Sequence, residues 1–220
     1  MQMLYRFSGS IQQYIEQISS CEETNRCRPT SCPQCESKQA LVCHGFYKRT
    51  VTDMDCDCVI RVRRFLCSAC RRTVSLLPEF ALPYLRFTIM VIGAFLKARL
   101  LFGQTMEGAA KSAHQSGMPY QRGQQWVHRF RRQAESVSAA LAALVRPIGA
   151  PDFVTRAIHM LEKTGWVQAH RFLFEHLRQH LLGWPAFLAP AGIPVTVTKA
   201  NARRGTAPHS TCMDSESSPA

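Results

Sequence analysis

The chain has 220 residues, ten cysteines and a formal net charge of +12. Its length allows one moderate hydrophobic core or two small ones. The basic excess is concentrated in residues 61–133, where thirteen Lys and Arg residues are balanced only by Glu79 and Glu107, a net charge of +11. A concentrated basic block predicts a polyanionic partner, most simply nucleic acid. A generally basic, solvated surface is the alternative.

The first residues do not resemble a secretory signal, because residues 1–20 contain Arg6 and Glu16 and lack a continuous apolar segment. We therefore expect reduced, cytoplasmic cysteines that bind metal rather than an extracellular set of disulfides. The most apolar segment, residues 89–96, is followed by Lys97 and Arg99, well short of the ~20 apolar residues that cross a bilayer. This segment is predicted to be a buried helix, and no membrane partner is expected.

Residues 1–30 are predicted to form a short amphipathic helix followed by a polar linker. Ser10 is suited to cap a helix over residues 9–19, and residues 21–30 form the linker. The apolar positions of this helix recur at helical spacing and are Ile11, Tyr14, Ile15 and Ile18.

Two C-x-x-C motifs, at residues 32–35 and 67–70, are separated by 31 residues. Two such pairs can place four thiolates around one tetrahedral zinc ion, so residues 31–77 are predicted to be a zinc ribbon. Four thiolate ligands leave no open position for water, so this zinc should be structural. A disulfide pair or a thioredoxin-like site is the alternative, but neither motif lies in a βαβ pattern. The predicted ligands are Cys32, Cys35, Cys67 and Cys70.

Two strands are predicted between the motifs, over residues 40–50 and 58–67, with the acidic residues 53–57 as their connection. In the second strand Ile60, Val62 and Leu66 alternate with Arg61, Arg63 and Phe65, which indicates a half-buried strand with a mainly basic outer face. Arg64 is the exception on the apolar face. Cys43 is expected to be a small core residue, and Cys56-Asp57-Cys58 is a weak candidate for metal binding. No role is assigned to Cys21, Cys27, Cys43, Cys56, Cys58 or Cys212.

A helical region is predicted over residues 84–146, after an extended segment marked by Pro78 and Pro83. A long helix over residues 86–102 ends at Gly103. A short helix over residues 106–113, a turn over 114–120 and a helix over 121–132 then follow. This order, with a Gln- and Arg-rich second helix, is typical of a helix-turn-helix. Trp126 is expected in the core, while Gly123 costs about 1 kcal/mol relative to Ala within a helix.

The candidate DNA contacts are of two kinds. Arginines suit phosphates, whereas Arg122, Gln124 and Gln125 could reach base edges in a major groove. A second basic cluster lies on the ribbon, for which a solvated strand face is the alternative. The predicted DNA-binding residues are Arg61, Arg63, Arg64, Arg71 and Arg72 on the ribbon and Arg122, Gln124, Gln125, His128, Arg129, Arg131 and Arg132 on the helix.

Residues 134–146 are predicted to continue as an Ala-rich helix, residues 152–184 to form one or two amphipathic helices, and residues 185–220 to be a disordered tail. His170, His176 and His180 are expected to be solvated or packed, with 176 and 180 on one helix face. The carboxylates after residue 133 are too few and too scattered for a two-metal nuclease site. We therefore predict no catalytic residues and no enzymatic activity.

The predicted fold class is α+β and mostly α: a small four-cysteine zinc ribbon followed by a helical domain with a helix-turn-helix. One set of motifs resembles the amino-terminal zinc ribbon of bacterial insertion-sequence transposases and related mobile-element proteins. It comprises Cys32-Pro-x-Cys35, His44-Gly45, Arg63-Arg64-Phe65-x-Cys67-x-x-Cys70-Arg71-Arg72-Thr73 and Leu77-Pro78. Gly103-Gln104-Thr105 through Trp126-x-x-Arg129-Phe130 resembles the helix-turn-helix that those proteins carry next. The resemblance covers residues 30–135.

This resemblance implies double-stranded DNA as the partner and the bacterial nucleoid as the location. Full transposases of this type carry a carboxylate-based nuclease domain next, and no such pattern follows residue 135. The expected function is therefore non-catalytic, sequence-specific DNA binding by an accessory, regulatory or truncated form. Two alternatives are a DNA-binding subunit of a transposase that another chain completes, and a zinc ribbon that contacts protein or RNA. The protein partner would be a transposase or a second copy of this chain.

Overall fold

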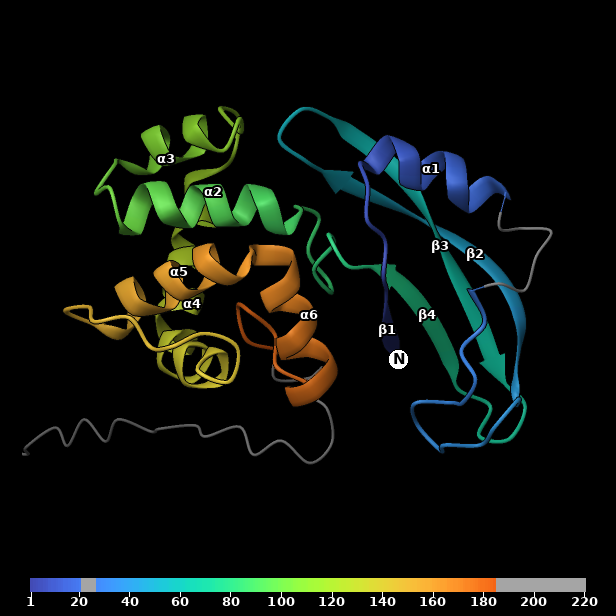
Figure 1. Cartoon of the computed structure of the whole chain (residues 1–220). Helices are drawn as coiled ribbons and strands as arrows, with labels where there is room; N and C mark the ends of the chain where they lie inside the picture. The colour runs from blue at the N-terminus through green and yellow to red at the C-terminus, as the bar shows by residue number, and fades with distance from the viewer. Residues whose placement is uncertain (21–26, 185–220) are drawn as a thin grey trace, which may run out of the picture. The chain divides into compact units, whose positions relative to one another are not determined.

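The computed structural model describes residues 1–20 and 27–184, and the expected tail over residues 185–220, most of the linker, Cys21 and Cys212 lie outside them (Figure 1). The described residues form a four-stranded sheet and six helices, a mixed α/β architecture. No helix among them is long and apolar enough to cross a membrane.

The sheet has the strand order β1-β4-β3-β2 and contains two strands that were not predicted. Strands β2 (Leu41–Thr52) and β3 (Asp57–Cys67) form the expected antiparallel hairpin, and β4 (Thr73–Pro78) is antiparallel to β3. The short β1 (Gln2–Tyr5) runs parallel to β4, with Gln2 opposite Ser75. The amino-terminal ammonium group donates to the Thr73 carbonyl at 2.8 Å. The first residues are therefore part of the sheet.

Strand β3 buries its two ends on opposite faces of the sheet. Ile60 and Val62 pack in one cluster with helix α1, whereas Phe65 and Cys67 pack in another at the cysteine end. Because side chains alternate along a strand, these even- and odd-numbered positions point to opposite sides. The placement of Phe65 on an outer face was wrong, since only 1% of it is exposed. A bulge in β2 between Cys43 and Phe46 accompanies this change of face.

Helix α1 (Ile11–Ser20) lies across one face of the sheet (Figure 1). The Ser10 hydroxyl accepts from the Gln13 N–H at 3.2 Å, while the Gln13 amide oxygen accepts from the Ser10 N–H at 2.8 Å. This reciprocal pair is a capping box, and it confirms Ser10 as the cap. The buried Ile11, Tyr14 and Ile18 cover Ile60, Val62 and Leu77 of the sheet.

The other helices are α2 (Ile89–Leu100), α3 (Met106–Ser112), α4 (Tyr120–Leu141), α5 (Phe153–Thr164) and α6 (Trp166–Leu177). They share a third core, larger than the two of the sheet. Helix α2 begins at Ile89 rather than at Arg86, because the Thr88 side chain accepts from the Val91 N–H and ends the preceding extended segment. Helix α4 runs without a break from the helix predicted over residues 121–132 into its predicted continuation, but it ends at Leu141 and not at residue 146.

Gly123 allows α4 to approach α2 closely. A Cβ atom at this position would lie 2.6 Å from Cζ of Phe95, too close for any real contact. The neighbouring Trp126 is 1% exposed, as expected, and its ring packs edge-on against Phe87 and Phe95 at centroid distances of 4.9 and 5.4 Å. The helix propensity lost at Gly123 is therefore offset by aromatic packing between the two helices.

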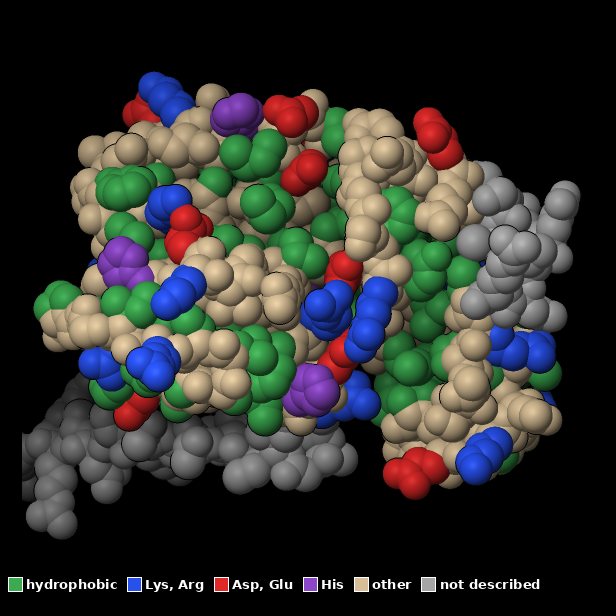
Figure 2. All heavy atoms as spheres, viewed as in Figure 1, with side chains coloured by type: hydrophobic (Ala, Val, Ile, Leu, Met, Phe, Trp, Pro, Cys, Tyr) green, Lys and Arg blue, Asp and Glu red, His purple; other side chains and the backbone are tan. Residues whose placement is uncertain are grey.

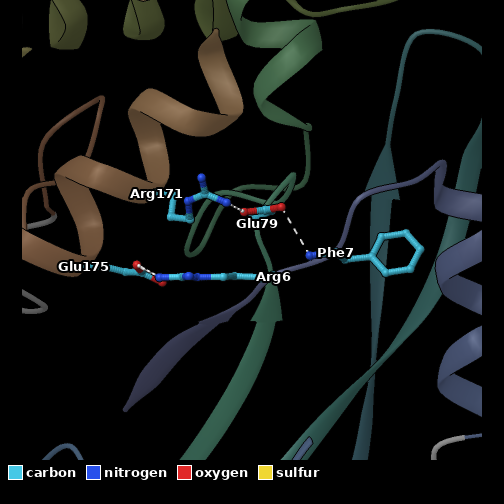
Figure 3. A network of polar contacts seen from close by, with 5 residues as sticks. All are labelled: Arg6, Phe7, Glu79, Arg171 and Glu175. Carbon is cyan, nitrogen blue, oxygen red and sulfur yellow. Dashed lines mark hydrogen bonds and ion pairs between the residues drawn. The ribbon is translucent and has the colours of Figure 1, made fainter. Parts of the chain in front are cut away.

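Paired charges join the sheet to α6 (Figure 3). The Glu79 carboxylate, at the end of β4 and only 6% exposed, accepts from the Phe7 N–H and from the Arg171 guanidinium, both at 3.2 Å. Arg6 and Glu175 form a second pair at 3.0 Å. Blue and red side chains meet at this seam on the face seen in Figure 2. The partners of Glu79 make its burial tolerable, since an unpaired buried carboxylate would be costly.

Candidate metal centre and nucleic-acid interface

The four predicted cysteine ligands are brought together at one end of the sheet. Their sulfur atoms all lie within 4.8 Å of one another, and no other such group of three or more metal-binding side chains occurs in residues 1–20 and 27–184. Cys32 and Cys70 are 3.8 Å apart at Sγ, and Cys35 and Cys67 are 3.6 Å apart. These sulfurs come from opposite motifs, so the cluster closes the loop between them.

The two motifs form knuckles with the same backbone hydrogen bonds. In the first knuckle, the Cys32 carbonyl accepts from Glu36 and the Cys32 N–H donates to Ser37. In the second, the Cys67 carbonyl accepts from Arg71 and the Cys67 N–H donates to Arg72. The first cysteine of each knuckle, Cys32 or Cys67, is buried, whereas Cys35 is exposed and Cys70 is half-buried. The arrangement is therefore a paired one, with each knuckle supplying one inner and one outer sulfur.

The sulfur separations fit a tetrahedral metal ion. Zinc–sulfur bonds of about 2.3 Å in tetrahedral geometry place ligand atoms about 3.8 Å apart. The separations of 3.6 and 3.8 Å between paired sulfurs match this edge length. An all-thiolate donor set suits a soft or borderline ion and leaves no position for water or substrate.

The thiols of the cluster influence each other's ionisation. Hydrogen bonds from the hydroxyl and backbone of Ser37, and from the sulfurs of Cys67 and Cys70, lower the pKa of Cys35 to about 6. The backbone of Arg72 favours the Cys70 thiolate, but burial and the other three sulfurs outweigh it and raise the pKa of Cys70 to about 12. Full deprotonation of the cluster therefore needs a cation to balance the crowded negative charge.

A small apolar cluster supports the four-cysteine group from the sheet. Leu41, Phe65 and Val74 are buried with Cys32 and Cys67. Met3 and Tyr5 of β1 pack against the same cluster. The contribution of β1 was missed in the sequence, because four residues are too short to show a strand pattern and the partner strand lies some 70 residues away.

Most of the residues of α4 that were predicted to contact DNA are exposed on one side of the helix. The opposite side carries Trp126, Val127 and Phe130 into the core. Helices α3 and α4 are joined by residues 113–119, a connection longer than the three or four residues usual in a helix-turn-helix. The exposed residues are Arg122, Gln124, Gln125, His128, Arg131 and Arg132.

Arg129 does not belong to this exposed set, and its assignment as a phosphate contact is corrected. Its Nε donates to the Leu182 carbonyl at 2.8 Å, and its Nη2 donates to the Gly183 carbonyl. The half-buried guanidinium has a pKa lowered by burial. The role of Arg129 is to attach the chain after α6 to α4, a contact between residues over fifty positions apart.

The ribbon arginines do not form one cluster in the structure. Arg61 and Arg63 both stack on Phe46, with guanidinium carbons 4.4 and 4.6 Å from the ring centroid. Cys43, which was expected in the core, is exposed and accepts from Arg63 at 2.8 Å. Arg64 points to the opposite face of β3, by strand alternation. Arg71 and Arg72 are exposed beside the second knuckle.

The predicted histidine pair is also revised. Helix α6 ends at Leu177, so His176 and His180 do not share a helix face. His180 is buried, and its ring contacts the Pro83 carbonyl at 3.2 Å and accepts from the Leu182 N–H at 3.0 Å. His170 is fully buried, and neither ring nitrogen has a hydrogen-bond partner. These two histidines are packed, as expected.

Residues 32–115 match a domain family described as Domain of unknown function (DUF6431). The matched region contains both knuckles, strands β2 to β4 and helices α2 and α3, and it ends in the connection before α4. No curated protein and no solved structure matches the chain.

Proposed function

We propose that this protein is a non-catalytic, sequence-specific DNA-binding protein with one structural zinc ion. The observation that carries the proposal is that α4 has one buried side and one exposed side. The exposed side presents two glutamines and three arginines between residues 122 and 132. The charge block of residues 61–133 includes this surface. An exposed helix face with this composition suits a DNA groove.

The zinc ion would be held by Cys32, Cys35, Cys67 and Cys70, whose sulfur separations fit a tetrahedral site. When bound, it supplies folding free energy, on the order of 10 kcal/mol. The knuckles and the end of β3 are joined through these sulfurs, so the metal orders this end of the sheet. No open coordination position remains for a catalytic water.

In the proposed complex, α3, the following connection and α4 act as a helix-turn-helix. The amino-terminal half of α4 enters the major groove, where Gln124 and Gln125 read base edges. Arg131 and Arg132, farther along the same exposed side, contact phosphates. The bacterial cytoplasm, at the nucleoid, is the location in which such a protein would act.

The alternative of an RNA-contacting ribbon has one observation in its favour. Phe46 lies on the sheet face beneath the guanidinium groups of Arg61 and Arg63. Aromatic and arginine planes on a sheet stack on unpaired bases in several nucleic-acid-binding proteins. Preferential binding to single-stranded RNA, lost in Phe46→Ala, would favour this alternative over duplex binding.

The test is fluorescence anisotropy of the full-length protein on duplexes selected from a random library. If about five phosphates are neutralised, log K should fall with log salt at a slope of roughly −4.5. Gln125→Ala should weaken binding to the selected site by about 1–3 kcal/mol and leave binding to random DNA unchanged. Absent or salt-independent binding would contradict the proposal. Cleavage of the selected duplex with Mg²⁺ would show that the protein, alone or with a partner chain, is an enzyme.

A further inference from the structure

A second pair of cysteines lies at the start of β3, apart from the metal centre. Cys56 and Cys58 flank Asp57, and their sulfur atoms are 3.0 Å apart. Both side chains are half-buried. Neither belongs to the four-cysteine group, and no third metal-binding side chain joins them within the described ranges 1–20 and 27–184. Two sulfurs alone are too few ligands for the metal site considered for this C-x-C motif.

The hairpin holds these two sulfurs in place. The Asp53 N–H donates to the Cys56 carbonyl at 2.8 Å, which closes the turn between β2 and β3. Asp57 is paired with Arg86 at 3.1 Å. The Gln12 side-chain amide of α1 donates to Sγ of Cys56 at 3.7 Å. Contacts from three separate segments thus fix the residues that carry the two thiols.

We propose that Cys56 and Cys58 are a redox-active dithiol that small-molecule disulfides oxidise to an intramolecular disulfide. A disulfide bond is about 2.05 Å long, so the sulfur atoms, now 3.0 Å apart, need to approach by only about 1 Å. Both residues are only half-buried, so the dithiol is partly exposed to solvent, and glutathione disulfide is the oxidant used to test it. This inference does not depend on DNA binding.

The two thiols have different parts in the exchange. Burial, the hydrogen bond and charge of Cys56, and the carboxylates of Asp53 and Asp57 raise the pKa of Cys58 to about 12. Cys58 therefore keeps its proton, and its sulfur lies 3.0 Å from the Cys56 sulfur, which also accepts from the Gln12 amide. Because Cys58 holds its proton, Cys56 is the attacking group and Cys58 is the second thiol to react.

The reaction proceeds by two exchanges. The Cys56 thiolate attacks one sulfur of glutathione disulfide, the glutathione S–S bond breaks, and one glutathione thiolate leaves. Cys58 then loses its proton and attacks the Cys56 sulfur of the mixed disulfide, which expels the second glutathione thiolate. Two electrons pass from the cysteines to glutathione, and the two protons that the cysteines lose end on the two glutathione thiols.

The sequence allows a direct test on the full-length, metal-loaded protein. Cleavage after Arg49 and Arg61 releases a peptide of residues 50–61 that contains Cys56, Cys58 and no other cysteine. The reduced protein is incubated with glutathione disulfide, alkylated, digested and analysed by mass spectrometry. The expected product is this peptide without alkylation and lighter than its reduced form by two hydrogens.

Variants separate the two steps. Cys58→Ser should keep glutathione attached to Cys56, because the second exchange is lost, whereas Cys43→Ser, which removes an exposed thiol of β2, should behave as the parent protein. A doubly alkylated 50–61 peptide after oxidation, a stable glutathione adduct on that peptide from the parent protein, or a disulfide that joins that peptide to another chain would each overturn the proposal. The peptide from the parent protein decides the matter even if a variant folds poorly.

Discussion

Glu36 and Arg71 have the same left-handed backbone conformation, each with φ of 59°, at equivalent places in the two cysteine knuckles. Each follows the second cysteine of its motif and donates its N–H to the carbonyl of the first cysteine, at 2.8 Å from Glu36 and 2.9 Å from Arg71. The left-handed region costs a non-glycine residue roughly 1–2 kcal/mol. Both knuckles therefore accept local strain to direct two sulfurs toward one point.

Glycine in place of Glu36 should relieve this strain. Glu36→Gly is expected to raise the free energy of unfolding by about 0.5–1 kcal/mol, because part of the gain is offset by the greater freedom of the unfolded chain. Urea unfolding of the metal-loaded protein measures the change. Glu36→Ala is the control, since it removes the charge but keeps the strain. A glycine variant no more stable than the alanine variant would contradict the strain argument.

Removal of one predicted ligand should release the metal. Cys67→Ser replaces a fully buried sulfur of the cluster, and we expect about one equivalent of zinc in the parent protein and almost none in the variant. The exposed Cys43 provides a control, because Cys43→Ser should leave the metal content unchanged. Elemental analysis gives the stoichiometry, and circular dichroism reports the loss of ordered sheet. A metal-free parent protein with an ordered ribbon would argue against the metal centre.

A methyl group at Gly123 should separate α4 from α2. Gly123→Ala would place a Cβ atom 2.6 Å from the Phe95 ring, and such overpacking typically costs about 1–3 kcal/mol of stability despite the better helix propensity of alanine. Gly117→Ala is the matched control, because nothing lies within 4 Å of its Cβ position. Thermal unfolding compares the two. Equal melting temperatures would show that α2 and α4 do not approach as closely as described.

Two buried histidines should make the protein sensitive to acid. Burial, followed by the charge of His180, lowers the pKa of His170 to about 3, and burial, followed by Arg129, lowers the pKa of His180 to about 4. An unfolded histidine titrates near 6.5, so between about pH 6.5 and 3 the unfolded state binds the extra protons. The free energy of unfolding should therefore fall as the pH falls through this window.

Replacement of one histidine isolates its contribution to the pH dependence of stability. His170→Phe is expected to reduce the slope of unfolding free energy against pH by up to about 1.4 kcal/mol per pH unit in this window. His176, which is exposed on the same helix, serves as the control with His176→Phe. Denaturant unfolding at several pH values between 7 and 4 gives the slopes. An unchanged slope in His170→Phe would mean that this side chain is not buried in its neutral form.

Neighbouring arginines of α4 should have separable effects. Arg129→Met removes donors to the Leu182 and Gly183 carbonyls and should destabilise the fold by about 1–3 kcal/mol. Arg131→Ala, at an exposed position, should leave stability unchanged, weaken binding to all duplexes and flatten the salt slope by about one unit. Denaturant unfolding of the two variants compares their stability, and fluorescence anisotropy compares their affinity for DNA. A loss of affinity in Arg129→Met without loss of stability would return Arg129 to the DNA contacts.

Several parts of the fold could be predicted because their signals are local. Helix α1 is predicted by the helical spacing of its apolar residues and by Ser10, whose capping hydrogen bonds reach only three residues along the chain. Strands β2 and β3 pair across a short hairpin, so their pattern and their turn lie in one stretch of sequence. The spacing of the two C-x-x-C motifs likewise predicted the cluster of four sulfurs.

By itself, then, the sequence determined the cysteine cluster, the hairpin and most of the helices, because each depends on residues close together in the chain. Only the tertiary structure decided the pairing of β1 with β4, the burial of Phe65 and the role of Arg129. Gln2 meets Ser75, and Arg129 meets Leu182, across more than fifty residues. Such contacts form because elements far apart in the chain bury a shared surface. Neither side-chain periodicity nor residue type predicts which distant element will pack against a given residue.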